Sequence, residues 1–239
     1  MGSIGNHLQE VKGRIAAACV DAGRDANTVT LLAVSKTFGA DAVREAHAAG
    51  QRAFGENYVQ EALAKIEALA DLRQRADAIE WHLIGPLQSN KTRPVAEVFD
   101  WVHSVDRLKI AQRLAEQRPP GLPPLQLCLQ VNISGEASKA GLLPGEVAAV
   151  AQAVAALPAD RVRLRGLMAI PEPTTDPAAQ RAPHRALREL LAAVNAALAA
   201  AAAGTVLDTL SMGMSADLEA AIAEGATLVR VGTAVFGSR

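Results

Sequence analysis

Short apolar runs and longer amphipathic segments alternate along the whole chain. Runs rich in β-branched and aliphatic residues, bounded by polar turns, predict buried strands, whereas apolar residues that recur every three or four positions predict helices. Eight runs predict strands: Val29–Lys36, Arg52–Glu56, Glu80–Gly85, Trp101–Val105, Leu125–Ile133, Arg163–Ile170, Val206–Met212 and Thr227–Phe236. Seven segments between them predict helices: Asp41–Ala49, Val59–Arg75, Ser89–Glu97, Leu108–Gln117, Pro144–Ala156, Ala178–Ala203 and Ala216–Glu224. Such strict alternation is typical of a parallel sheet with helical crossovers.

Eight such repeats in 239 residues favour an α/β fold with one closed (β/α)8 barrel of the TIM type. No eighth helix is expected because the chain ends at Arg239, and an extra N-terminal helix from about His7 to Ala22 is expected to cover the same face. An open doubly wound sheet alternates in the same way and remains the competing architecture. The proline-rich run Pro119–Pro124 falls between a helix and a strand, so we expect residues 1–239 to form a single domain.

Composition narrows the location and the partners of the protein. The chain has 24 Lys and Arg residues against 25 Asp and Glu residues, so no overall charge favours nucleic acid or an anionic membrane. Met1–Lys12 lacks the apolar core of a signal peptide, and Ala192–Ala203 is too short to span a bilayer, which predicts a cytoplasmic protein. Cys19 and Cys128 fit no metal spacing and are expected to be buried thiols. We expect no metal site.

Lys36 ends the first predicted strand, and strand ends carry the chemistry of barrels of this kind. A lysine held beside apolar walls can lose its proton and attack an aldehyde, which forms a Schiff base. For a single lysine, the alternative of a solvated side chain that only ends a strand is more common.

A second group of candidate residues follows the last two predicted strands. Ser215 precedes a predicted helix whose amides can bind an anion, although a serine there is also a common N-cap. On the last strand, Gly232 permits close backbone approach and Thr233 offers a hydroxyl, although a barrel strand also tolerates a glycine. Phosphate is often held at this position in such barrels.

Barrel closure brings Lys36 beside this possible phosphate site, which fits a phosphorylated aldehyde such as pyridoxal 5′-phosphate. Arg230 lies two residues before Gly232 on the same strand face and is placed to meet the pyridine nitrogen. A cation there disfavours ring protonation and weakens the cofactor as an electron sink. The alternative is an arginine that pairs with a structural carboxylate.

Several ordered motifs carry a resemblance to a known family: LLAVSKT at Leu31–Thr37, FGENYVQEALAK at Phe54–Lys65, WHLIGPLQSNK at Trp81–Lys91, GLMAIP at Gly166–Pro171, and LSMGMSADLEAAI and VRVGTAVFG near the C-terminus. The chain resembles the pyridoxal phosphate homeostasis protein family, whose barrel is similar to the N-terminal domain of bacterial alanine racemases. The resemblance implies Lys36 as the Schiff-base lysine and Arg230 as the ring-nitrogen partner. It also implies that Ser215, Gly232 and Thr233 contact the phosphate and that Asn57 approaches the ring. Family members often carry a second basic residue just after the lysine, where this chain has Thr37-Phe38-Gly39.

Four further residues have open interpretations. His82 and His103 are expected to be hydrogen-bonded barrel histidines. Lys139 follows the fifth strand and is either a solvated loop lysine or a second site of Schiff-base formation. Tyr58, the single tyrosine, packs beside the cofactor or on a helix face.

The function that we expect is intracellular pyridoxal phosphate homeostasis by a carrier or regulator, with no catalytic residue. Racemisation needs acid and base groups on both faces of the bound amino acid, and the chain ends with its barrel, without length for the domain that supplies the second base in alanine racemases. A pyridoxal-phosphate-dependent amino-acid racemase or a Schiff-base aldolase is the alternative, and a structural interaction barrel is the third. We expect a monomer that makes transient contacts with pyridoxal-phosphate-dependent enzymes and binds neither nucleic acid nor membrane.

Overall fold

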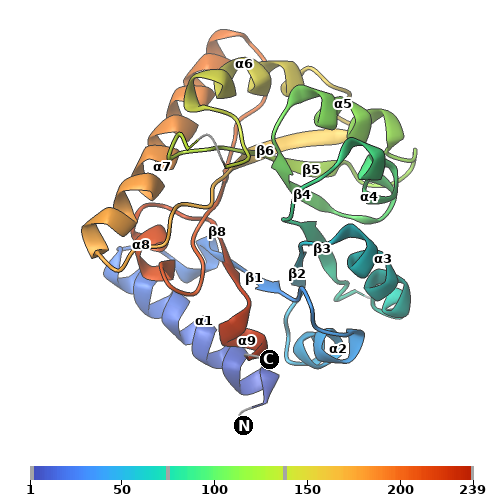
Figure 1. The fold of residues 1–239 in the computed structure, drawn as a ribbon, viewed down its shortest axis with the longest axis vertical. Helices are drawn as coiled ribbons and strands as arrows, with labels where there is room; N and C mark the ends of the chain where they lie inside the picture. Colours follow the sequence, from blue (N-terminus) through green and yellow to red (C-terminus); the bar gives the residue numbers. More distant parts are fainter. Residues whose placement is uncertain (1–2, 74–75, 137–138, 238–239) are drawn as a thin grey trace.

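Eight parallel strands form a closed barrel that is surrounded by helices in the computed structural model, which describes residues 3–73, 76–136 and 139–237 (Figure 1). Each strand pairs with the next along the chain, and β8 pairs with β1 to close the ring. The predicted (β/α)8 barrel is therefore confirmed, and the open doubly wound sheet is excluded.

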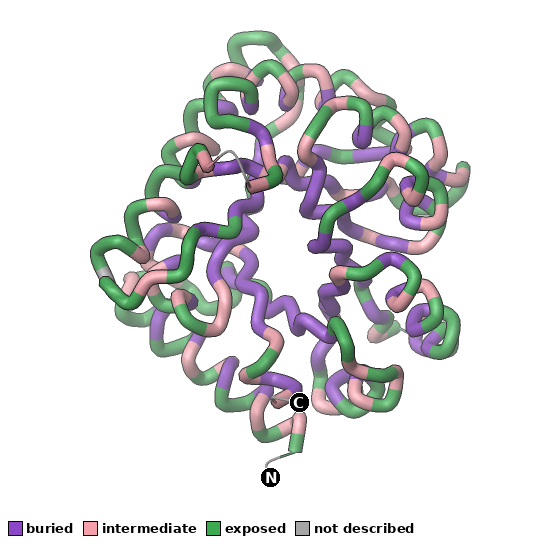
Figure 2. The backbone as a smooth tube through the Cα atoms, in the orientation of Figure 1, coloured by how far each residue is buried: buried purple, intermediate pink, exposed green. Residues whose placement is uncertain are grey.

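The strands are β1 Thr30–Val34, β2 Ala53–Glu56, β3 Glu80–Leu83, β4 Trp101–Val105, β5 Leu125–Gln130, β6 Val162–Met168, β7 Thr209–Ser211 and β8 Leu228–Val231. The helices are α1 Ile4–Asp21, α2 Ala40–Ala48, α3 Val59–Ala68, α4 Thr92–Val98, α5 Leu108–Gln117, α6 Pro144–Ala155, α7 Pro177–Ala200, α8 Leu218–Ala223 and α9 Thr233–Phe236, with short 3₁₀ turns η1 Ala26–Thr28, η2 Ala70–Leu72 and η3 Ser89–Lys91. Buried residues follow the strands and the inner faces of the helices, whereas the outer faces are exposed (Figure 2).

Both strands at the barrel closure end earlier than the apolar pattern predicts. β1 ends at Val34, because Thr37 has a φ of 70° and turns the chain out of the sheet. β8 ends at Val231, and the chain turns at Gly232 into the short helix α9. The apolar pattern continues to Phe236 because this ring stacks on Phe38, with 5.1 Å between the centroids. Lys36, Gly232 and Thr233 therefore lie beyond the strands rather than in them.

Some predicted helix bounds also change. The helix predicted to end at Arg75 ends at Ala68 and is followed by a 3₁₀ turn, and Arg75 itself lies outside the described residues. Ser215 and Ala216 lie in a turn, because α8 begins only at Leu218.

The N-terminal helix closes the side of the barrel beside the last strands, as predicted. α1 packs against α2, α8 and α9 and buries Leu8, Val11 and Ile15 in the core (Figure 1). Arg14 of α1 adds an ion pair to Glu219 of α8 at 2.8 Å. The expectation of no helix after the last strand was wrong by one short element, since α9 follows β8.

The structure also bears on the two cysteines and on the length of the apolar helices. Both Cys19 and Cys128 are buried, and burial raises the pKa of the Cys128 thiol to about 12. Cys128 is therefore uncharged and inert at neutral pH. None of the helices in the described parts of the chain has both the length and the apolar character to cross a membrane.

Close approach of β6 and β7 depends on a glycine. A Cβ at Gly166 would lie 1.8 Å from the Thr209 carbonyl oxygen, so an alanine must push the two strands apart. We expect Gly166→Ala to lower the free energy of unfolding by about 1–3 kcal/mol, measured by urea denaturation. Gly13→Ala is the control, because nothing lies within 4 Å of its Cβ position in α1 and alanine favours a helix. A Gly166→Ala variant as stable as the Gly13→Ala variant would contradict this packing.

Candidate functional site

The carboxyl ends of β1, β7 and β8 meet at one mouth of the barrel. Ala33 of β1 pairs with Val231 of β8, so the turns that follow these strands are neighbours. A Cβ at Gly232 would lie 3.3 Å from the Val34 carbonyl oxygen, which places Gly232 directly against the end of β1. Barrel closure thus brings the Lys36 turn beside Gly232 and Thr233, as the sequence predicted.

Lys36 itself is exposed at this mouth and follows the buried Ser35. Lys36 was expected to end the first strand, but the strand ends at Val34 and the turn carries Lys36 out of the buried sheet. Its amine is accessible to a ligand that enters from solvent.

Asn57 carries an unused hydrogen-bonding group at the end of β2. Its Oδ1 is buried and has no hydrogen-bond partner among the described residues. The neighbouring loop approaches very closely, since a Cβ at Gly85 would lie 2.1 Å from the Asn57 carbonyl oxygen. A buried acceptor without a donor is costly, so this position suits a donor group from a bound ligand.

Ser215 lies half-buried in the turn between β7 and α8. The N-cap alternative for Ser215 was wrong, because Asp217 holds that position. Asp217 Oδ1 accepts a hydrogen bond from the Met214 amide at 2.6 Å, and its Oδ2 lies 2.9 Å from His184 Nε2. Burial alone would raise the pKa of Asp217, but these bonds hold it below the ordinary value. Asp217 therefore stays ionised and fixes the shape of this turn.

Arg230 is buried inside the barrel, where carbonyl groups hold its guanidinium. It donates to the Ser211 carbonyl at 2.6 Å, to Ser211 Oγ at 2.8 Å and to the Ala169 carbonyl at 2.9 Å. The alternative of a structural carboxylate partner was wrong, since none of the described carboxylates bonds to this side chain. Burial lowers the pKa of Arg230 to about 10, so it remains a cation at neutral pH.

A chain of polar side chains continues from Arg230 across the barrel interior. His103 Nδ1 lies 2.8 Å from Ser211 Oγ, and His103 Nε2 lies 2.9 Å from His82 Nδ1. His82 Nε2 is 3.3 Å from Glu80 Oε2 near the opposite mouth. Burial, with the charges of His82 and Arg230, holds the pKa of His103 well below its ordinary value. His103 is thus a neutral, hydrogen-bonded barrel histidine, as predicted.

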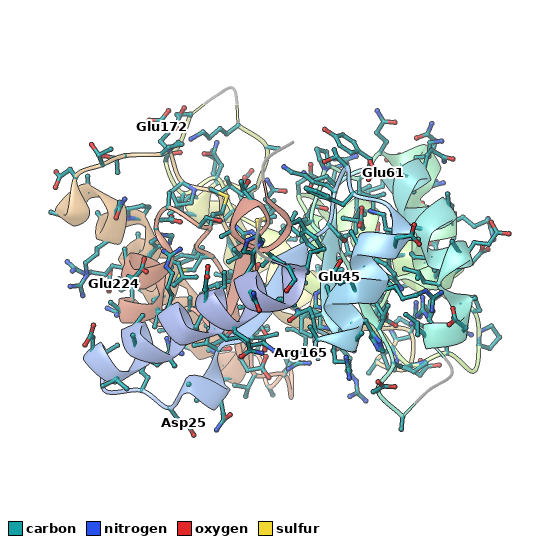
Figure 3. All side chains as sticks on the ribbon, turned by 90° about the horizontal axis from the view of Figure 1, so that it is seen from below. Asp25, Glu45, Glu61, Arg165, Glu172 and Glu224 are labelled. Carbon is teal, nitrogen blue, oxygen red and sulfur yellow. The ribbon has the colours of Figure 1, made fainter. Side chains whose placement is uncertain are left out.

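Sequence reasoning missed the side chains that support these positions. No role was predicted for Ser211, which joins Arg230 to His103 through its Oγ. Glu61 and Lys65 bond to the turn around Lys36, and their spacing of four residues within the FGENYVQEALAK motif was the available signal. Figure 3 places Glu61 at the same end of the barrel as Glu172, with the labelled Asp25 and Arg165 at the other end.

Lys139 and Tyr58 keep their open interpretations. Lys139 pairs with Glu136 at 2.8 Å and lines a cavity of about 320 Å³ together with Met214. Tyr58 is 58% exposed at the start of α3. In the described ranges, no group of three or more His, Cys, Asp or Glu residues is arranged to hold a metal ion.

Comparisons with known proteins place the chain in a family. The model of the alanine racemase N-terminal domain matches residues 13–239. A pyridoxal phosphate homeostasis protein of Pseudomonas aeruginosa is 63% identical over 239 residues, which cover 100% of this chain and 97% of that protein. Its namesake in Escherichia coli K12 is 51% identical, and the match covers 100% of this chain and 98% of that protein.

A solved structure supports the same grouping. PipY of Synechococcus elongatus PCC7942, described with PLP bound, has 40% sequence identity and a TM-score of 0.81, and the match covers 98% of this chain and 100% of that chain. The chain therefore belongs to the alanine racemase N-terminal domain family and, within it, to the pyridoxal phosphate homeostasis proteins.

Proposed function

We propose that this protein binds pyridoxal 5′-phosphate at the carboxyl mouth of its barrel and acts in the homeostasis of that cofactor, without efficient turnover of amino acids. One observation carries the proposal: an exposed lysine follows β1, Gly232 lies against the end of that strand, and a buried, unpaired acceptor on Asn57 follows the neighbouring β2. The names of relatives at 63% and 51% identity and the PLP-bound PipY structure support it.

Lys36 is the proposed covalent attachment point. The cofactor, when bound, supplies an aldehyde that condenses with a primary amine and a ring that can accept electrons. Unprotonated Lys36 Nζ adds to an aldehyde carbon, and the carbonyl oxygen leaves as water when the Schiff base forms. The reaction is reversible and needs no oxidant or reductant, which suits a protein that both holds and releases the cofactor.

The turns after β7 and β8 are the proposed phosphate contacts. Gly232 lacks the Cβ that would crowd a group beside the end of β1, and Thr233 is exposed next to it at the start of α9. Ser215 lies in the turn that Asp217 holds, with its side chain half-buried. Backbone amides and hydroxyls of this kind donate to phosphate oxygens.

Arg230 and Asn57 are the proposed partners of the ring. Because Arg230 keeps its positive charge at neutral pH, it disfavours a proton on a nearby pyridine nitrogen and weakens the ring as an electron sink. Asn57 Oδ1 offers its unused acceptor to a donor on the cofactor. The charge of Arg230 favours storage of the cofactor over amino-acid chemistry.

The remaining expectations belong to the same proposal. We propose that residues 1–239 act as one cofactor-binding domain in the cytoplasm, as a monomer that makes transient contacts with pyridoxal-phosphate-dependent enzymes. The near balance of 24 basic and 25 acidic residues supports a protein that binds neither nucleic acid nor membrane.

Replacement of Lys36 tests the attachment point. We expect Lys36→Ala to abolish the visible absorbance of the bound cofactor and the adduct trapped by borohydride, because Lys36 is the proposed attachment point. Weaker, non-covalent binding through the phosphate should survive. A trapped adduct that mass spectrometry maps to another lysine in the unmodified sequence, with none on Lys36, would contradict the assignment.

Removal of two hydroxyls tests the phosphate contacts. Ser215→Ala combined with Thr233→Ala should weaken binding of pyridoxal phosphate more than binding of unphosphorylated pyridoxal. Each lost charge-assisted hydrogen bond is expected to cost about 1.5–3 kcal/mol in a titration. Equal weakening for both ligands would place the phosphate elsewhere.

A panel of amino acids tests the functional conclusion. The purified protein, loaded with cofactor, should leave L- and D-amino acids unchanged in chiral chromatography, because Arg230 disfavours the protonated ring. Turnover of about 1–10³ per second, the usual range for enzymes, would instead favour a racemase or an aldolase.

A further inference from the structure

The two peptide groups on either side of Lys36 are both bound by side chains of α3. Lys65 Nζ donates to the carbonyl oxygen of Ser35 at 2.8 Å, and Glu61 Oε1 accepts from the amide of Thr37 at 2.5 Å. Ser35 and Thr37 are the residues immediately before and after Lys36. Side chains of α3 thus bind the backbone on both sides of this lysine.

These bonds belong to one connected cluster, the Lys36 brace, which consists of Ser35, Glu56, Glu61 and Lys65. Lys65 Nζ lies 3.3 Å from Glu61 Oε1 and 2.6 Å from Glu56 Oε1. Glu56 Oε1 also accepts from Ser35 Oγ at 2.6 Å. The brace joins the end of β1, the end of β2 and the first turns of α3.

A helix can be attached to a barrel without buried charged groups such as those of the Lys36 brace. The side chain of Lys65 is 4% exposed and that of Glu56 is 0% exposed, and burial of charged groups is costly compared with apolar packing. Apolar residues of α3, such as Ala62 and Ile66, already pack against the core. The polar groups therefore serve a need other than burial of the helix.

The backbone conformation of Thr37 indicates what these polar groups hold in place. Its φ of 70° is rare for a β-branched residue and persists only where the surroundings hold it. This conformation turns the chain out of β1 and exposes Lys36. The turn is closed by a hydrogen bond from the Phe38 amide to the Ser35 carbonyl oxygen at 3.1 Å. Lys65 and Glu61 hold its first two peptide groups from α3, so loss of either bond loosens the turn and changes the direction of the Lys36 side chain.

We propose that Glu61 and Lys65 are positioning residues for Lys36, which fix the direction of its amine toward the aldehyde of the cofactor. The inference rests on the proposed function and deepens it. Neither side chain is proposed to touch the cofactor, since both act through the peptide groups of Ser35 and Thr37.

The covalent fraction of bound cofactor separates positioning from general damage. It is the amount trapped on Lys36 by borohydride divided by the total cofactor that the folded protein retains. Loss of a fold lowers both amounts, whereas a misdirected Lys36 lowers the trapped amount while phosphate contacts still retain the cofactor.

Glu61→Ala and Lys65→Met should each slow formation of the trapped adduct about tenfold, the effect expected when a hydrogen bond to a charged group is lost. The covalent fraction at a fixed short time should fall accordingly. Glu61→Gln keeps an oxygen that accepts from the Thr37 amide and should match the unmodified protein. This rescue distinguishes a lost hydrogen bond from lost charge.

Arg118→Met is the matched control for loss of a buried cation that binds carbonyl groups. Arg118 is 3% exposed and donates to the carbonyl oxygens of Ala96 at 2.8 Å and Phe99 at 2.7 Å, both outside the Lys36 brace. The control should lower the thermal midpoint without changing the covalent fraction or the rate of adduct formation.

Adduct formation at the unmodified rate in folded Glu61→Ala and Lys65→Met variants would overturn the inference while the proposed function stands. If Lys65→Met does not fold, Glu61→Ala decides, because the Glu61 side chain is 33% exposed and tolerates truncation. An unmodified protein that retains no pyridoxal phosphate would instead overturn the proposed function and the inference with it.

Discussion

Parallel pairing of β1 with β8 is the constraint on which the rest of the candidate site depends. This ladder brings residues near the two ends of the chain together, with Thr30 opposite Leu228 and Ala33 opposite Val231. α1 protects this closure from outside by packing on α8 and α9. The turn that carries Lys36 and the turn that begins at Gly232 then lie against each other, and a barrel closed in another register would separate them.

Buried polar groups form a hydrogen-bonded network inside this barrel. Arg230 requires several carbonyl and hydroxyl partners inside the barrel, and it finds them on β7 and just after β6. Ser211 then extends the bonding to His103. A buried polar group without a hydrogen-bond partner costs free energy, whereas a network in which every group has a partner is rigid. Such a network therefore fixes its side chains in one arrangement. Arg230 is therefore a cation held in one position inside the barrel.

Hydrophobic periodicity predicted the architecture, because strand and helix periods are local properties of the sequence. β4 Trp101–Val105 and α5 Leu108–Gln117 have the predicted bounds. The strand ends at the barrel mouth were less predictable, because residues beyond the ladder, such as Ala169 and Phe236, still pack in the core. The φ of Thr37 depends on a local turn bond from Phe38 to Ser35 and on the distant Glu61, which apolar periodicity does not reveal.

Most residues of the candidate site were predicted from their places near strand ends, whereas Asn57 was predicted only from the resemblance to a family. Lys36 and Gly232 were found because strand ends carry chemistry in barrels, whereas the role of Glu61 and Lys65 was hidden, since such a pair usually lies on a solvated helix face. A crystal structure of the protein grown with pyridoxal 5′-phosphate would show where the cofactor binds. We expect electron density continuous with Lys36 Nζ, phosphate density against Ser215, Gly232 and Thr233, and the ring nitrogen facing Arg230. Cofactor density at the opposite mouth of the barrel, or joined to Lys139 alone, would contradict this expectation.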